Sequence, residues 1–192
     1  GFACGDLTAI FVNDKSGDAN VFNLSQVTAG DFNLSTVTVN GSAGKDEIIG
    51  SAFSDTINGG EDNDLLRGGP GDDALNGGKG DDTYAYSSTD FDEDTINDEE
   101  GERDTIDLSE LMDDVQWGIG SDMGFVVSLN DFVLAPPGQI EIYIGGDGND
   151  EFVFYDAEAN ATIKSIDGGG SDNSISYEDF EESVKVDLRN GS

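Results

Sequence analysis

A nine-residue repeat is the feature that most constrains the fold of this chain. Residues 41–85 divide without a gap into five nonapeptides, which read GSAGKDEII, GSAFSDTIN, GGEDNDLLR, GGPGDDALN and GGKGDDTYA. All five have glycine at position 1, aspartate at position 6 and an apolar residue at position 8. Repetition with so short a period predicts a solenoid, in which each repeat is one unit of a stack.

Each of the three fixed columns has a physical role. Positions 1–6 are rich in glycine because a tight turn needs positive φ angles and close backbone approach. Positions 7–9 then form a three-residue strand, and because side chains alternate along a strand, only position 8 faces the core. The residues predicted to point inward are Ile48, Ile57, Leu66, Leu75 and Tyr84.

The composition excludes several classes of function. The chain has 192 residues, with 42 acidic against 8 basic side chains and a net charge of −34, and the acidic residues concentrate after residue 40. A chain this acidic repels phosphate backbones and anionic lipids, so we expect no nucleic-acid partner. No apolar run approaches the ~18 residues of a membrane span. Histidine is absent, which removes the Ser-His-Asp, Cys-His and HExxH arrangements, and Cys4 is the only cysteine.

The nonapeptides resemble the repeats-in-toxin (RTX) family, the hemolysin-type calcium-binding region, whose motif is GGxGxDxUx with U a large apolar residue. The resemblance implies an all-β fold: a calcium-binding parallel β-roll, which is a right-handed β-solenoid, with flanking β segments. In such a roll two nonapeptides make one coil, so turns 18 residues apart stack on the same side. The stacked aspartates would be Asp46, Asp64 and Asp82 along one edge, and Asp55 and Asp73 along the other.

Electrostatics explains why several calcium ions belong between such turns. Carboxylates one strand spacing apart, ~4.8 Å, repel by roughly 1 kcal/mol in water and by several times that at an effective dielectric near 20. Calcium takes about 6–8 oxygen ligands in flexible geometry, whereas magnesium prefers a rigid octahedron. Zinc is disfavoured because histidine is absent and there is one cysteine.

The resemblance also implies a set of ligands for each ion. One turn would provide the carbonyls of positions 2 and 4 with its Asp 6, and the next turn the carbonyls of positions 1 and 3 with its own Asp 6. On the first edge these residues are Ser42, Gly44 and Asp46 with Gly59, Glu61 and Asp64, and then Gly60, Asp62 and Asp64 with Gly77, Lys79 and Asp82. On the opposite edge they are Ser51, Phe53 and Asp55 with Gly68, Pro70 and Asp73.

Some positions depart from the motif. Serine replaces the second glycine in the first two repeats, and Phe53 and Asp62 replace the fourth residue, so we expect the first two repeats to be the most distorted or metal-poor. A separate nonapeptide, GGDGNDEFV at 145–153, predicts a further calcium ligand at Asp150, which has no partner in phase 18 residues away. In GGGSDNSIS, at 168–176, we interpret Asn173 as a structural turn residue.

The rest of the chain predicts four regions: an N-terminal β lead-in at 1–40, the RTX calcium β-roll at 41–110, a β flank at 111–144 and a second short RTX-like segment at 145–192. Strands are expected at Leu7 to Val12, Val21 to Leu24, Val37 to Val39 and Val184 to Leu188. The acidic residues of 92–102 are interpreted as a solvated run, with irregular calcium coordination as the alternative. Trp117, Phe125, Phe152, Phe154 and Tyr155 are interpreted as core or capping residues rather than a glycan platform.

These features favour a non-enzymatic, secreted, extracellular calcium-binding module. The family resemblance implies type I secretion, in which the chain stays unfolded at low cytosolic calcium and folds outside the cell. Two alternatives stay open: an accessory module of a larger secreted enzyme, and a spacer or ligand-reading segment of a surface adhesin with a cell-surface or glycan partner. The oligomeric state is not indicated by the sequence.

Overall fold

A computed structural model describes residues 8–28, 36–88, 90, 92–98, 101, 103–119, 125–127, 131–134, 140–154 and 163–177. Within this part of the chain all regular secondary structure is β-strand, and no helix of membrane-spanning length and hydropathy is found there. Cys4, Pro136, Tyr155 and the strand predicted at Val184 to Leu188 lie outside the described residues.

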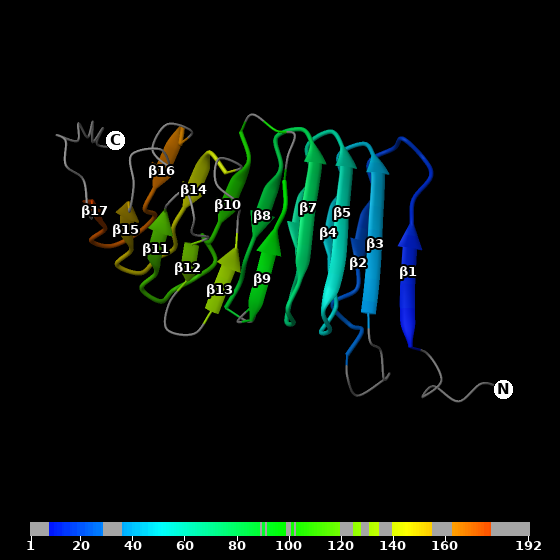
Figure 1. The fold of residues 1–192 in the computed structure, drawn as a ribbon, viewed down its shortest axis with the longest axis horizontal. Coiled ribbons are helices and arrows are strands. Elements are labelled where there is room, and N and C mark those ends of the chain that lie inside the picture. The colour runs from blue at the N-terminus through cyan, green and yellow to red at the C-terminus, as the bar shows by residue number, and fades with distance from the viewer. Residues whose placement is uncertain are drawn as a thin grey trace.

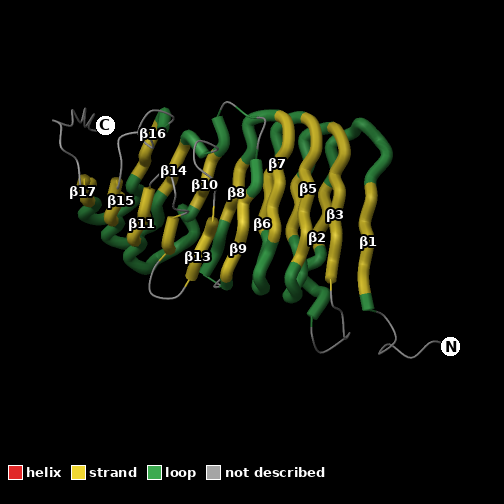
Figure 2. Tube along the Cα trace, viewed as in Figure 1, coloured by secondary structure: helices red, strands yellow, loops and turns green. Residues whose placement is uncertain are grey.

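Two long parallel sheets form opposite faces of a solenoid, as Figures 1 and 2 show, with turns along both edges. The first sheet has the order β1-β3-β5-β7-β9-β13-β12, and the second has the order β16-β14-β10-β8-β6-β4-β2. The first-sheet strands are β1 (Ala9–Asn13), β3 (Thr36–Ala43), β5 (Asp55–Glu61), β7 (Ala74–Lys79), β9 (Glu93–Ile96), β12 (Phe125–Val127) and β13 (Asp131–Leu134). The second-sheet strands are β2 (Val21–Asn23), β4 (Glu47–Ile49), β6 (Leu65–Arg67), β8 (Thr83–Ala85), β10 (Thr105–Asp107), β14 (Ile142–Ile144) and β16 (Ser165–Asp167).

The strand registers confirm that two nonapeptides make one coil. In the second sheet Ile48 pairs with Leu66, which is 18 residues further along the chain. In the first sheet Ile57 pairs with Leu75 across the same interval. The all-β parallel roll expected from the repeats is therefore the fold of this protein.

The core is a stack of the position-8 side chains, one from each strand. Ile48, Ile57, Leu66 and Tyr84 are fully buried, and Leu75 is 1% exposed. Burial of an aliphatic side chain of this size contributes about 1.5–3 kcal/mol. The stack extends beyond the repeats, because the buried residues Ile96, Ile106 and Leu108 belong to the same cluster.

A third sheet completes the C-terminal part of the molecule. It contains β11 (Gln116–Ile119), β15 (Glu151–Phe154) and β17 (Ser174–Tyr177), all parallel. Trp117 is buried, stacks on Phe152 with ring centroids 5.2 Å apart, and meets Tyr143 of β14 edge-on at 5.4 Å. The interpretation of Trp117, Phe152 and Phe154 as core residues is confirmed; the side chain of Phe125 lies outside the described part.

The second sheet runs without a break through the whole roll, whereas the opposite face changes near residue 120. There β12 and β13 form an antiparallel pair, and β13 joins the first sheet by pairing in parallel with β9. At the N-terminal end, β1, β2 and β3 lie at the strands predicted for the lead-in. The repeat of Phe22 to Ser25 at 32–35 lies outside the described residues.

Candidate metal centres

Carboxylates form a hydrogen-bonded ladder along one edge of the roll, where the chain turns from the first sheet into the second; we call this the first ladder. The backbone N–H of Asp46 donates to Asp64 Oδ1 at 2.7 Å, and the N–H of Asp64 donates to Asp82 Oδ1 at 2.7 Å. The ladder continues from the N–H of Asp82 to Asp104 Oδ1 and from the N–H of Asp104 to Glu141 Oε2. Position 6 therefore stacks in every coil of this edge, through intervals of 18, 18, 22 and 37 residues.

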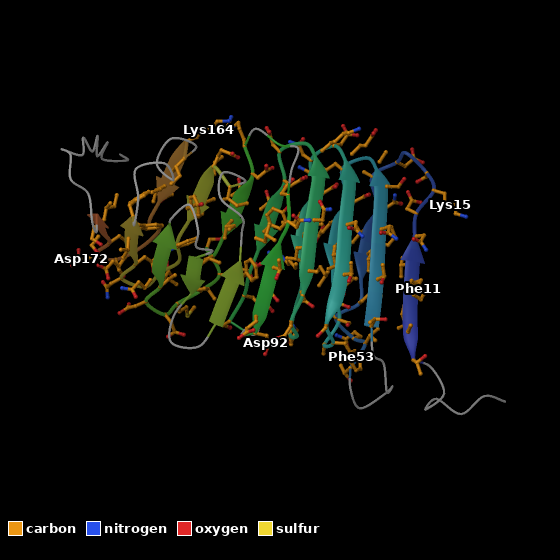
Figure 3. All side chains as sticks on the ribbon, viewed as in Figure 1. Phe11, Lys15, Phe53, Asp92, Lys164 and Asp172 are labelled. Carbon is orange, nitrogen blue, oxygen red and sulfur yellow. The ribbon has the colours of Figure 1, made fainter. Side chains whose placement is uncertain are left out.

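Two further ladders follow turns that leave the second sheet. In the second ladder, the N–H of Asp55 donates to Asp73 Oδ1 and the N–H of Asp73 donates to Asp94 Oδ1. In the third, the N–H of Val115 donates to Asp150 Oδ1 and the N–H of Asp150 donates to Asn173 Oδ1. In Figure 3, Phe53, Asp92 and Asp172 mark these turns along the lower edge, opposite Lys15 on the upper edge.

One oxygen of most repeat carboxylates is buried without a hydrogen-bond partner among the described residues. These atoms are the Oδ2 atoms of Asp46, Asp64, Asp73 and Asp82. The side chains are at most 2% exposed, and burial raises the pKa of Asp73 to about 9, of Asp64 to about 7 and of Asp82 to about 6. Burial also raises the pKa of Asp46. A buried carboxylate oxygen without a donor is costly, so each Oδ2 needs a proton or a cation.

The glycine at position 1 makes room for this oxygen. A Cβ on Gly59 would overlap Asp64 Oδ2, and a Cβ on Gly77 would overlap Asp82 Oδ2. None of the five position-1 glycines has a positive φ, so the turn conformation predicted as one reason for glycine there is wrong for this column. Positive φ occurs instead at positions 2 and 4, as at Gly78 and Gly80, and Ser42 and Asp62 adopt it without being glycine.

Carbonyl oxygens of neighbouring turns face one another beside the carboxylates. Ser42 O and Gly60 O point toward the next coil, against Gly60 and Gly78 respectively. Gly59 O and Gly77 O point back, against Gly41 and Gly59. The space between two turns is thus lined by backbone and carboxylate oxygens, the hard donors that calcium prefers.

Comparison with protein families agrees with this geometry, since residues 49–84 match the RTX calcium-binding nonapeptide repeat in four copies. Residues 49–84 are RTX calcium-binding repeats. No curated protein and no solved structure matches the chain. The roll is therefore a calcium-binding module, and the orphaned Oδ2 atoms and facing carbonyls of its RTX repeats fit that ion.

The second RTX repeat differs from the others because its aspartate is already satisfied. The Ser51 N–H donates to Asp55 Oδ2 at 2.5 Å, and Ser51 Oγ donates to Asp55 Oδ1 at 3.0 Å. Asp150 is similar, since the Gly146 N–H donates to its Oδ2 at 3.1 Å. The first repeat keeps its orphaned Asp46 Oδ2, so of the two repeats expected to be poorest in metal, this difference is confined to the second.

Asn173 shows what can occupy the position of a cation in such a turn. Its Nδ2 takes the place of the aspartate Oδ2 and donates to Gly168 O at 2.9 Å and to Gly170 O at 2.8 Å. These carbonyls belong to positions 1 and 3 of that nonapeptide. The interpretation of Asn173 as a turn residue is confirmed, and the carbonyls of positions 1 and 3 converge on the position-6 side chain, as the family pattern implies.

The structure places the other predicted ligands as follows. The Glu61 and Lys79 side chains point outward and form an exposed ion pair at 2.9 Å, which leaves only their backbone for an ion. Pro70 is exposed, whereas Phe53 packs against the core and its carbonyl lies against Gly71. Gly44 approaches Asp18 of the preceding coil, and Gly68 approaches its own Asp73. Their roles as calcium ligands remain predictions.

Sequence analysis missed several ladder residues. Asp94, Asp104 and Glu141 continue the ladders, although Asp-Thr-Ile at 94–96 and 104–106 repeats the join between aspartate and strand. Asp150 was expected to lack a partner, yet its N–H bonds to Asn173, 23 residues later, because a longer connection precedes β16. Asp98 is 1% exposed, so the interpretation of 92–102 as a solvated run is wrong for this residue, while Asp92 and Glu93 are exposed.

Proposed function

We propose that this chain is a non-enzymatic module of a secreted protein that folds when it binds extracellular calcium. The buried ladder carboxylates carry this proposal. Four Oδ2 atoms lie inside the turns without a hydrogen-bond donor among the described residues, and at neutral pH they place negative charge at the spacing of a β-ladder. Such a stack is unstable until cations neutralise it.

The calcium range of such modules explains why folding and secretion would be coupled. Extracellular calcium modules bind at about 10⁻⁴–10⁻³ M, far above the concentrations at which cytosolic sensors respond. Metal binding free energy is folding free energy when the unfolded chain lacks a formed site. In the cytosol the chain therefore stays unfolded, which suits passage through a type I secretion channel, and it folds outside the cell.

A role without catalysis follows from the arrangement of the acidic residues. The acids of 46–82 recur with the nonapeptide phase and serve the ladders, so their positions are explained by the stacking of coils. A glycosidase would require a pair of carboxylates flanking a substrate site. We therefore assign this module a structural and calcium-responsive function.

Circular dichroism during a calcium titration tests the proposal. We expect the chelated chain to lose the β-spectrum of the roll and to regain it cooperatively in the millimolar range. Magnesium at the same concentration and ionic strength should restore markedly less, because it dehydrates reluctantly and requires octahedral geometry. A β-spectrum that is unchanged by chelator would overturn calcium-dependent folding.

A further inference from the structure

Three buried carboxylates meet where the last RTX repeat contacts the first irregular coil. One oxygen from each of Asp82, Asp98 and Asp104 lies within 4.8 Å of the other two. All three side chains are buried, with exposures of 0%, 1% and 2%. Asp82 and Asp104 are steps of the first ladder, whereas Asp98 belongs to no ladder and lies outside the segment that matches the RTX repeat.

The strand register explains why Asp98 points inward. Leu75 pairs with Ile96, so Asp98 lies opposite Gly77, at position 1 of its coil. Side chains alternate along the strand: Ile96 is buried, Asn97 is exposed and Asp98 is buried again. The five nonapeptides have glycine at this position, and Asp98 therefore places a carboxylate where the repeats have no side chain.

Tyr84 holds Asp98 in this orientation. Its hydroxyl donates to Asp98 Oδ2 at 2.6 Å and accepts a hydrogen bond from the Gly77 N–H at 2.7 Å. The other four repeats have isoleucine or leucine at position 8. The aromatic residue thus supplies the polar group that fixes the added carboxylate.

A second observation points to a ligand in this cluster. Asp82 Oδ2 is fully buried and has no hydrogen-bond partner among the described residues. Burial, with smaller contributions from the neighbouring carboxylates, raises the pKa of Asp82 to about 6 and of Asp104 to about 7. At neutral pH three such groups repel one another unless a positive charge lies between them.

We propose that Asp82, Asp98 and Asp104 bind a calcium ion at a three-carboxylate site, with Tyr84 as its positioning residue. The proposal rests on calcium binding by the roll and adds a site where the regular repeats end. Sites between regular repeats offer two aspartates, whereas this one offers three. Affinity of oxygen-lined calcium sites depends on the number of charged ligands, so this ion is the most tightly held and remains bound when the others have been removed.

Counting bound calcium tests the site directly. Asp98→Asn keeps an oxygen acceptor for the Tyr84 hydroxyl but removes one charge, and Glu93→Gln removes one charge from an exposed position on the same coil. Equilibrium dialysis with elemental analysis is expected to give one calcium fewer for Asp98→Asn than for the wild type, and no change for Glu93→Gln. Because the tightest ion is lost, the difference should be clearest at low calcium. An equal ion count in Asp98→Asn, with wild-type circular dichroism, would overturn the site.

Terbium luminescence gives a second measurement, which also decides the matter if Asp98→Asn fails to fold in saturating calcium. Terbium replaces calcium and emits when a nearby tyrosine is excited, so Tyr84→Phe should lose the emission that appears first in a titration. Tyr86→Phe, which changes a buried tyrosine beside Asp73 and Asp94, should keep that first component. First-phase emission unchanged in Tyr84→Phe would overturn the proposal. Loss of calcium-dependent folding in the wild type would instead count against the function proposed above.

Discussion

The turns at 59–64 and 168–173 have the same backbone plan but satisfy it differently. In each, position 1 is a glycine against the position-6 side chain, and one oxygen of that side chain accepts the N–H of the preceding ladder residue. Asn173 then donates its amide to Gly168 O and Gly170 O. Asp64 has an oxygen in the place of that amide, and this oxygen has no donor among the described residues.

The comparison teaches that a nonapeptide turn needs a positive or donating group at its centre. An amide meets that need within the chain, and the turn is then independent of solution conditions. A carboxylate meets it only with a proton or a cation, which makes the turn responsive to calcium. The Ser51 turn solves the opposite half of the problem, because it provides donors to the carboxylate itself.

Acidification should produce the largest effect, because it acts on the ladder carboxylates together. Burial raises the pKa of Asp55 and Asp82 to about 6, of Asp64, Asp94 and Asp104 to about 7, and of Asp73 to about 9. Unfolded aspartate titrates near ~3.9, so the folded calcium-free roll binds more protons from about pH 4 upward and its stability falls as pH rises through the folded pKa values.

In chelator, circular dichroism should therefore show more β-structure at pH 5 than at pH 8.5. A protonated aspartate also has an O–H that can donate to a carbonyl, as the Asn173 amide does. A calcium-free spectrum that loses β-structure on acidification to pH 5 would break the analogy between the two turns.

Asp64→Ala should give the next largest effect. Asp64 lies between Asp46 and Asp82 in the first ladder, so its loss affects the spaces on both sides. We expect the calcium midpoint for folding to rise about tenfold, equivalent to ~1.4 kcal/mol, with lower cooperativity. Asp55→Ala, at a carboxylate already bonded to Ser51, is the matched control and should shift the midpoint less. An equal or larger shift for Asp55→Ala would contradict this ranking.

Gly59→Ala tests the space reserved for the carboxylate. The added methyl group would overlap Asp64 Oδ2 and lie 2.6–2.7 Å from no more than one further backbone oxygen, Gly77 O at 2.7 Å. Because Gly59 lacks a positive φ, the backbone itself can accept alanine. We expect the midpoint to rise several-fold, but less than for Asp64→Ala. Gly17→Ala, whose methyl group would have no neighbour within 4 Å, should leave the calcium titration unchanged.

Asn173→Asp should have the smallest effect, because this turn is exposed near the C-terminal end of the described roll. The substitution exchanges the donating amide for an oxygen and converts the turn to the Asp64 type. The expected result is a small loss of stability in chelator that calcium reverses, measured by thermal unfolding. Asn173→Ala should lose stability in chelator without recovery in calcium. Recovery in both variants would mean that calcium acts elsewhere.

Sequence analysis predicted the regular part of the roll well, for a physical reason. The coil is built from two nonapeptides, so the spacing of Asp46, Asp64 and Asp82 along the chain equals one coil, and their stacking needs no information from distant segments. The same holds for the inward position of Leu66 and Leu75, since alternation along a strand is local.

The irregular coils could not be predicted in this way. Intervals of 21, 22 and 37 residues join Asp73 to Asp94, Asp82 to Asp104 and Asp104 to Glu141. Only the pairing of strands across those connections brings these carboxylates into register. Sequence spacing alone likewise gives no reason to pair Asp150 with Asn173.

The sequence by itself therefore determined the repeat unit, the apolar stack and the presence of an acidic edge, because each depends on contacts within one coil. The tertiary structure decided which carboxylates have a hydrogen-bond donor and which do not. Ser51 satisfies Asp55, whereas Asp64 has an oxygen without a donor and Asp98 turns inward beside Tyr84. Those differences depend on which groups adjacent coils bring together, and the spacing of a motif does not contain that information.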